Sequence, residues 1–209
     1  MYHPNLKAHY RFESTQANLG IDASGNGHHG TVYGATQGIG QFGGGADFDG
    51  VNDYIDLEAS DDLRPANITV SFYANPTVFG IGSAISLGGD STGRGVILFS
   101  ATGGNVRFIM QIDGILRIIN IPKTSIPLNA YNHYVATYNG IDFVVYFKGF
   151  EYDRINAIGS ITYKENNNVI GKLGDTSLFF NGSLDEVKIF NKACDLIDIN
   201  LLRIGQNPR

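Results

Sequence analysis

A chain of 209 residues, 43% of them hydrophobic, can bury one sizeable core and is too apolar to remain disordered as a whole. The 27 glycines and the charged fraction of only 17% are typical of many short strands joined by tight turns. A formal net charge of −5, with scattered Lys and Arg, argues against a nucleic-acid partner, because such binding depends on clustered basic side chains.

Alternating apolar and polar residues predict strands from the start of the chain onward. The clearest case begins at Ile68, where Val70, Phe72 and Ala74 follow at every second position, which predicts a half-buried strand with one face in the core. Further strands are expected in the first half of the chain at residues 6–12, 30–36, 46–49, 54–57, 84–87 and 96–101.

Two hairpins are predicted in the second half of the chain. The alternating residues 106–112 lead into Asp113-Gly114, a strong hairpin turn signal, and residues 115–121 return. The second hairpin joins residues 133–138 to 142–148 through Asn139-Gly140. The remaining expected strands are residues 160–164, 169–173 and 184–190.

About a dozen short strands predict an all-β, two-sheet antiparallel β-sandwich, since a single open sheet of that size would expose a whole apolar face. One short C-terminal helix is expected at residues 195–203, with Asp195 as its cap and Gly205 as its stop. The chain shows neither a repeat nor a linker-like segment, so we expect residues 1–209 to form one domain.

No basic and apolar leader precedes the first strand, and no apolar run approaches the roughly 20 residues that span a bilayer. We therefore expect neither a cleaved signal peptide nor membrane insertion. A protein of this kind stays in the cytoplasm or leaves by another route, such as assembly into a virus particle that is released by lysis. The lone Cys194 cannot form an internal disulfide and is expected to be a small buried hydrophobe.

Several segments carry a family resemblance in their motifs and in their order. They are residues 8–13, 22–30, 42–57 with the pattern Phe-Asp-Gly-x-x-Asp-Tyr, 131–140 with the pattern Tyr-Asn-His-Tyr-Val-Ala-Thr-Tyr-Asn-Gly, and 180–193. Together they resemble the laminin-G-like jelly roll of the concanavalin A-like lectin/glucanase superfamily, with Tyr131 where the family usually has tryptophan. The resemblance implies a jelly-roll sandwich used for binding, without naming the ligand.

A possible ion-binding loop begins at Asp22. With Ser24, Asn26 and Gly27 it places oxygen ligands at alternate positions and a glycine at the sharp turn, as in the first half of a calcium loop. The twelfth residue of the pattern is Tyr33 rather than a bidentate Glu, so the loop is not an EF-hand. A plain Asx and glycine turn explains the pattern equally well.

Strand alternation places Asp185 on the same side as Val187, which should face the core, and a carboxylate there is costly unless it is paired, hydrogen-bonded or bound to a cation. Members of the family often hold a structural Ca²⁺ between the early loops and the closing strand. The resemblance makes Asp49, Asp53 and Asp185 the corresponding positions. We therefore expect either a calcium site that draws on Asp22, Asp49, Asp53 and Asp185, or a buried hydrogen-bond acceptor at Asp185.

Catalysis is not indicated by the pattern of acidic residues. Catalytic relatives of the fold carry alternating acids such as Glu-x-Asp-x-Glu on one strand, and this chain has no such run. Asp61 and Asp62 would point to opposite sides of an extended segment, and the glutamates are isolated. We therefore expect a protein that is not an enzyme.

The expected ligand face lies on two loops, residues 22–29 and 88–94. The candidate ligand-binding residues are Asn26, His28, His29, Asp90 and Arg94. The expected function is non-enzymatic recognition or adhesion, with a glycan or cell-surface receptor as partner. The expected setting is a virion surface, as a spike, fibre or capsid decoration in contact with other virion proteins. One alternative is a structural virion protein that forms homo-oligomers without a small ligand, and the other is a polysaccharide-cleaving enzyme.

Overall fold

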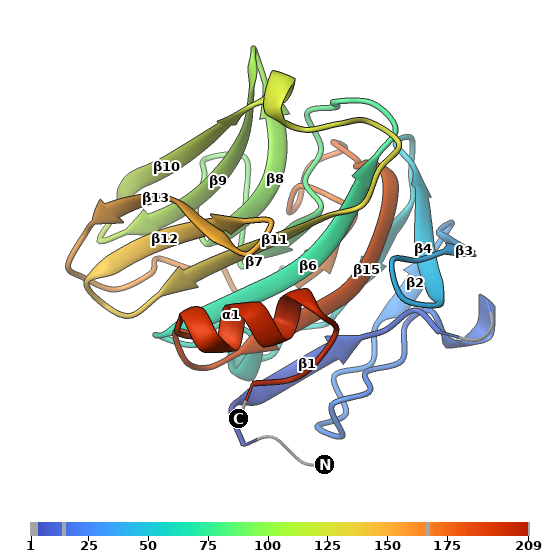
Figure 1. Ribbon diagram of the computed structural model, residues 1–209, viewed down its shortest axis with the longest axis horizontal. Helices are drawn as coiled ribbons and strands as arrows, with labels where there is room; N and C mark the ends of the chain where they lie inside the picture. The colour runs from blue at the N-terminus through green and yellow to red at the C-terminus, as the bar shows by residue number, and fades with distance from the viewer. Residues whose placement is uncertain (1–3, 14–15, 166–167, 209) are drawn as a thin grey trace.

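A computed structural model describes residues 4–13, 16–165 and 168–208, and these form two antiparallel sheets packed face to face (Figure 1). Sheet A has the strand order β13-β12-β11-β6-β15-β4-β3, with β1 also paired to β15, and sheet B has the order β10-β9-β8-β7-β14-β5-β2. The sandwich and the single C-terminal helix agree with the sequence prediction.

The elements are β1 (Leu6–Tyr10), β2 (Thr31–Tyr33), β3 (Thr36–Ile39), β4 (Gly44–Asp49), β5 (Tyr54–Asp56), β6 (Ile68–Pro76), β7 (Ile85–Leu87), β8 (Val96–Thr102), β9 (Asn105–Ile112), β10 (Ile115–Pro122), β11 (Asn132–Tyr138), β12 (Asp142–Phe147), β13 (Phe150–Asn156), β14 (Asn168–Ile170), β15 (Asn181–Phe190), α1 (Leu196–Arg203) and the 3₁₀ turns η1 (Gln16–Asn18), η2 (Asp61–Leu63) and η3 (Lys123–Ser125).

The core between the sheets is built by the alternating residues. In β6, Ile68 and every second residue to Ala74 are fully buried, and β9 alternates buried and half-buried positions along its whole length. Tyr134 of β11 lies at the centre, with its ring 5.6 Å from that of Phe72 and 5.8 Å from that of Phe108. Aromatic rings from both sheets therefore pack together and fix the distance between the two layers.

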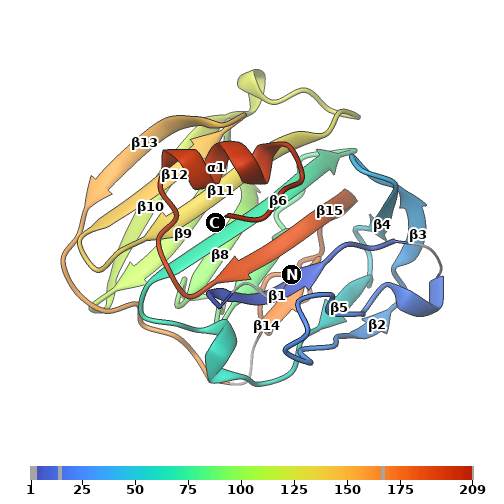
Figure 2. The ribbon, with the colours of Figure 1, turned by 60° about the horizontal axis from the view of Figure 1, so that its bottom comes forward.

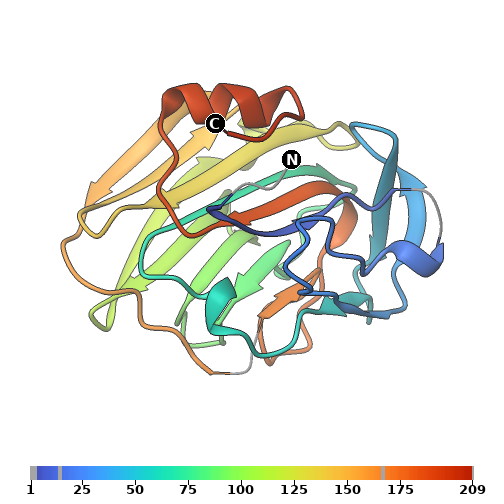
Figure 3. The ribbon, with the colours of Figure 1, turned by 90° about the horizontal axis from the view of Figure 1, so that it is seen from below.

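Strand β6 is buried on both faces, so the expectation of a half-buried strand is wrong. Its outward-facing Thr69 donates a hydrogen bond to the carbonyl of Lys192, and the hydroxyl of Tyr73 donates to the carbonyl of Arg203. The cause is the C-terminal segment, because α1 lies along the outside of sheet A (Figures 2 and 3). A second apolar cluster joins this helix to the sheet: Leu6, Val135, Val144, Tyr146, Phe190, Cys194, Ile199 and Leu202.

Helix α1 begins and ends where the sequence predicts. The side chain of Asp195 accepts a hydrogen bond from the backbone N–H of Asp198 at 2.9 Å, and Gly205 after the helix has a φ of +77°. Cys194 is buried beside it, as expected, and burial raises the pKa of its thiol to about 12. No helix within residues 4–13, 16–165 and 168–208 is long and apolar enough to cross a bilayer.

The predicted strands differ from the structure in three places. Strand β13 is not predicted, because it forms an edge of sheet A and six of its seven residues are exposed, so burial imposes no apolar alternation. Residues 160–164 contribute only an isolated bridge between Ile161 and Ile112. Residues 30–36 divide into β2 in sheet B and the start of β3 in sheet A, with Gly34 at a φ of +73° between them.

Candidate functional site

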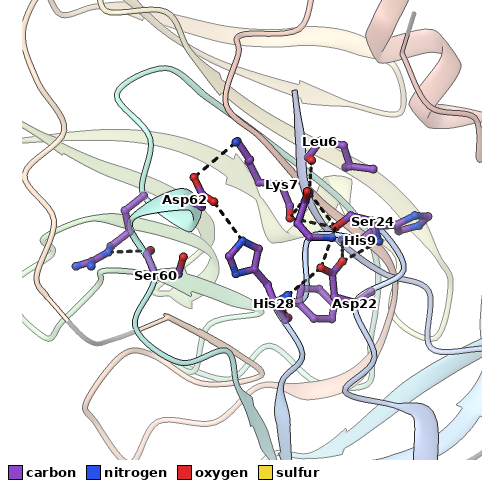
Figure 4. A network of polar contacts seen from close by, with 11 residues as sticks. Leu6, Lys7, His9, Asp22, Ser24, His28, Ser60 and Asp62 are labelled. Carbon is purple, nitrogen blue, oxygen red and sulfur yellow. Dashed lines mark hydrogen bonds and ion pairs between the residues drawn. The ribbon is translucent and has the colours of Figure 1, made fainter. Parts of the chain in front are cut away.

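The loop at residues 22–29 is organised by the carboxylate of Asp22 (Figure 4). That carboxylate accepts backbone N–H groups of His9, Ser24 and His28 at 2.8–3.0 Å and the hydroxyl of Ser24 at 2.8 Å. Burial alone would raise the pKa of Asp22, but these hydrogen bonds to the ionised form outweigh burial and lower it. Asp22 therefore anchors the loop to β1.

The predicted ligand-binding residues of this loop make internal contacts. The amide of Asn26 donates to the backbone of β1 at 2.7 Å, and Nδ1 of His29 accepts the backbone N–H of Asp22 at 3.0 Å. Nε2 of His28 lies 3.6 Å from Oδ2 of Asp62, which Figure 4 shows on the adjacent 3₁₀ turn η2. These contacts give the loop a fixed shape, and its role in ligand binding stays a prediction.

Asp49 and Asp53 shape the turn between β4 and β5. Oδ1 of Asp49 accepts the N–H of Val51 at 2.7 Å, and Oδ2 of Asp53 accepts the N–H of Asp49 at 2.9 Å. In the part of the chain that the structure describes, no group of three or more His, Cys, Asp or Glu side chains could hold a metal ion. Asp22, Asp49, Asp53 and Asp185 thus do not converge on one centre, and calcium stays a prediction.

Strand β15 has a bulge between Asp185 and Lys188, where Glu186 takes a φ of +50°. Asp185 pairs with the outward-facing Tyr73 of β6, so the expectation that it shares the core-facing side with Val187 is wrong. Its oxygens accept the N–H of Phe42 at 2.9 Å and that of Glu186 at 2.7 Å. Asp185 is thus the buried acceptor of the alternative prediction, and burial raises its pKa to about 7.

Glu186 lies at the centre of a buried ionic cluster that sequence reasoning missed. Its Oε2 is 2.7 Å from Nζ of Lys188 and 3.1 Å from Nε2 of His9, and its Oε1 is 3.7 Å from Nε of Arg11. Burial would raise the pKa of Glu186, but the His9 hydrogen bond and the Lys188 charge lower it to about 2. The available signal was a pair of opposite charges, Glu186 and Lys188, two residues apart in the closing strand.

A groove on the outer face of sheet B, which we call the sheet B groove, has a volume of ≈ 240 Å³. Ile97 of β8 and Ile109 of β9 lie on its floor, since both point away from the core. Its other lining residues are Ile81, Asp90, Ser91, Gly93, Ser100, Thr102, Arg107, Leu173 and Leu178. Segments far apart in the sequence therefore meet around two adjacent strands.

Of the two ligand-binding residues predicted on the loop of residues 88–94, Asp90 lines this groove. Its Oδ1 accepts the hydroxyl of Thr92 at 2.6 Å and the N–H of Arg94 at 3.3 Å, and Nε of Arg94 lies 3.4 Å from Oδ2. Burial would raise the pKa of Asp90, but these hydrogen bonds, with the charge of Arg94, lower it. Asp90 thus holds the loop in shape while forming one wall.

The chemistry of the sheet B groove suits an oligosaccharide. Its isoleucine floor can contact the apolar C–H face of a sugar, and the hydroxyls of Ser91 and Thr102 can bind sugar hydroxyls. The guanidinium of Arg107 makes no hydrogen bond or ion pair within the described residues, so its five donors are available. Asp90 is the only carboxylate among the lining residues, whereas glycoside hydrolysis generally uses two.

A comparison with family models places the chain in a family. A family model described as the concanavalin A-like lectin/glucanases superfamily matches residues 49–200, and the chain belongs to that superfamily. The match confirms the resemblance carried by the sequence motifs. No curated protein matches the chain.

Among solved structures, the chain is similar to Domain 4 of AbnA, a GH43 extracellular arabinanase from Geobacillus stearothermophilus, in complex with arabinotriose. The TM-score is 0.77 at 18% identity, over 95% of this chain and 98% of that one. It is also similar to the binding domain of Paraclostridial Mosquitocidal Protein 1, with a TM-score of 0.76 at 18% identity over 96% of this chain and 52% of that one.

A third similar structure is the receptor binding domain of botulinum neurotoxin C/D mosaic serotype, with a TM-score of 0.73 at 16% identity over 97% of this chain and 51% of that one. The chain thus spans about half the length of the two toxin domains and the full length of the arabinanase domain. The two toxin neighbours are binding domains, and at such identities all three structures show a shared fold.

Proposed function

We propose that this chain is a non-enzymatic carbohydrate-binding module that holds an oligosaccharide in the sheet B groove. The observation that carries the proposal is the arrangement of the unpaired Arg107 guanidinium beside an apolar floor of Ile97 and Ile109. A concave, mostly apolar surface with a few polar groups is the combination that orients a polar ligand with apolar faces.

The arabinanase domain supports this proposal and supplies the first probe. That domain matches this chain over nearly its whole length and was solved in complex with arabinotriose. The toxin domains support it less directly, because this chain matches only about half of each, and their receptor site can lie in the other half. Arabinotriose, followed by an array of neutral and acidic glycans, is therefore the appropriate ligand series.

Isothermal titration of arabinotriose and of the glycans that score on the array tests the proposal. Arg107→Gln is expected to weaken binding about tenfold or more, because a hydrogen bond to a charged donor contributes about 1.5–3 kcal/mol. Arg154→Gln, on the exposed edge strand β13, is the matched control and should bind like the unsubstituted protein. Equal affinity of the two variants, or no binding to any glycan, would overturn the proposal.

The enzyme alternative has one candidate pair, Asp185 and Glu186, whose pKa values lie far apart, as in an acid and base couple. Asp185, however, has no exposed surface, and Glu186 is held by Lys188 and His9. We therefore propose that the pair is structural. Release of reducing ends from polysaccharides that bind the module would contradict this assignment.

Calcium and the biological setting are further proposals. A thermal melt tests calcium: a higher midpoint in excess Ca²⁺ than in chelator would support a bound ion, and equal midpoints would exclude it as a stabilising ligand. For the virion surface, detection of the protein in purified particles by mass spectrometry would support that setting. Light scattering tests the structural alternative, which requires a stable homo-oligomer and no binding to any glycan on the array.

A further inference from the structure

A second cavity, of ≈ 280 Å³, lies on the outer side of sheet A. It is lined by Gln41, Tyr73, Tyr131, Asn132, His133, Lys148 and Arg203. These residues come from the β3–β4 loop, from β6, from the start of β11, from the β12–β13 turn and from the end of α1. We call it the Tyr131 cavity, and it shares no residue with the sheet B groove.

The charged residues that line the Tyr131 cavity are both cations. Lys148 makes no ion pair within the described ranges, and its Nζ lies 4.8 Å from the ring of Phe147. Arg203 likewise makes no ion pair there, and its stem lies against Gly149, where a Cβ would meet the Arg203 Cδ. Since Gly149 has a φ of +87°, this turn lets the Arg203 side chain pack beside Lys148.

Three carboxyl groups lie near this cavity: that of Asp47 acts electrostatically on Tyr131, and those of Asp185 and Glu186 already have partners. Asp185 accepts two backbone N–H groups, and burial raises its pKa to about 7, which reduces its negative charge near neutral pH. Glu186 is balanced by Lys188 and by its hydrogen bond with His9. Within the described residues, neither Lys148 nor Arg203 therefore has a carboxylate in direct contact.

His133 supplies an unmet hydrogen bond at the same place. The residue is 3% exposed, its Nε2 lies 2.9 Å from the hydroxyl of Ser71, and its Nδ1 has no partner. Burial, with the charges of Lys188 and Arg203, lowers the pKa of His133 to about 3, so the ring is neutral. A buried polar atom without a partner is unfavourable, and a polar ligand in the cavity would relieve that penalty.

We propose that the Tyr131 cavity binds one acidic sugar residue, with its carboxylate between Lys148 and Arg203. Arginine matches the planar geometry of a carboxylate with paired donors. The ring of Tyr131 offers an aromatic face, and the amides of Gln41 and Asn132 can bind hydroxyl groups. The volume of ≈ 280 Å³ is close to the roughly 300 Å³ at which small-molecule pockets begin, which is enough for one sugar ring.

NMR titration of the whole chain with methyl glucuronide and, separately, with methyl glucoside tests this site. We expect the glucuronide to bind at least tenfold more tightly, because only its carboxylate can pair with the two cations. The ring resonances of Tyr131 should shift on binding. Equal affinity for the two sugars, or no response at Tyr131, would overturn the proposal.

Substitutions separate this site from the sheet B groove. Arg203→Gln and Lys148→Gln should each weaken glucuronide binding about tenfold. Lys123→Gln is the matched control, because the Lys123 side chain also lies over an aromatic ring, that of Phe79 at 5.5 Å, outside this cavity. Arg107→Gln should leave the glucuronide-dependent shifts of the Tyr131 ring unchanged, because Arg107 does not line the Tyr131 cavity, so failure of either site is observed independently. Glucuronide binding that survives both cavity substitutions would contradict the assignment.

Discussion

Glu186→Gln tests the buried ionic cluster of β15 most sharply. The substitution keeps the shape of the side chain and removes the charge that lies 2.7 Å from the buried ammonium of Lys188 and 3.1 Å from His9. Removing one partner of a buried ion pair costs about 3–5 kcal/mol, because the other charge stays buried without compensation. For a chain of this length, each kcal/mol lowers Tm by about 2–4 °C, so a cost of about 3 kcal/mol lowers Tm by about 6–12 °C.

Urea unfolding and a thermal melt measure this cost, with Glu151→Gln as the control. Glu151 pairs with Arg154 at 2.9 Å on the exposed strand β13, and such pairs contribute only about 0.2–1 kcal/mol. The pKa of Glu186 is lowered from 4.5 to about 2, so its contribution is present above about pH 4.5 and is lost as pH falls through about 2. The unsubstituted protein and Glu186→Gln should therefore become similar in stability as the pH is lowered. If Glu186→Gln and Glu151→Gln destabilise the protein equally at neutral pH, the reasoning is refuted.

Three further substitutions test individual structural assignments. Asp195→Ala removes the helix cap that accepts from Asp198 and should cost about 1 kcal/mol by urea unfolding; no loss would mean that the cap does not stabilise α1. The pKa of Asp22 is lowered on folding, so the stability that its carboxylate contributes should be lost as pH falls below about 4. In urea denaturation at several pH values, the free energy of unfolding should fall less steeply with acidification for Asp22→Asn than for the unsubstituted protein. An equal pH dependence of the two proteins would contradict this. Gly171→Ala places a Cβ against the ring of Phe48 at a φ of +84° and should lower Tm by several degrees, whereas an unchanged melt would contradict the packing.

The architecture could be predicted from the sequence because burial imposes a pattern. The alternation from Ile68 to Ala74 and the cap at Asp195 are local signals, and both are confirmed by the structure. The bulge between Asp185 and Lys188 leaves no such signal, so simple alternation put Asp185 on the wrong side of its strand. Burial of the outer side of β6 was also missed, because it depends on where α1 docks.

The candidate sites were less predictable for a related reason. The loop residues Asp90 and Arg94 were expected near the ligand, and Asp90 does line the sheet B groove. Arg107, by contrast, carries no motif, and it gains its importance only when β8 and β9 pair and the segment that contains Leu173 and Leu178 borders their outer face. Sites built from segments distant in the sequence need the fold before they can be seen.

Methyl NMR during titration with the best-binding oligosaccharide tests the central claim most directly. The δ-methyl groups of Ile97 and Ile109, on the floor of the sheet B groove, should shift progressively and reach saturation together. That of Ile199, on the buried face of α1 and on the other side of the molecule, should not move. Saturation binding that leaves Ile97 and Ile109 unshifted would show that the ligand binds elsewhere and would contradict the account.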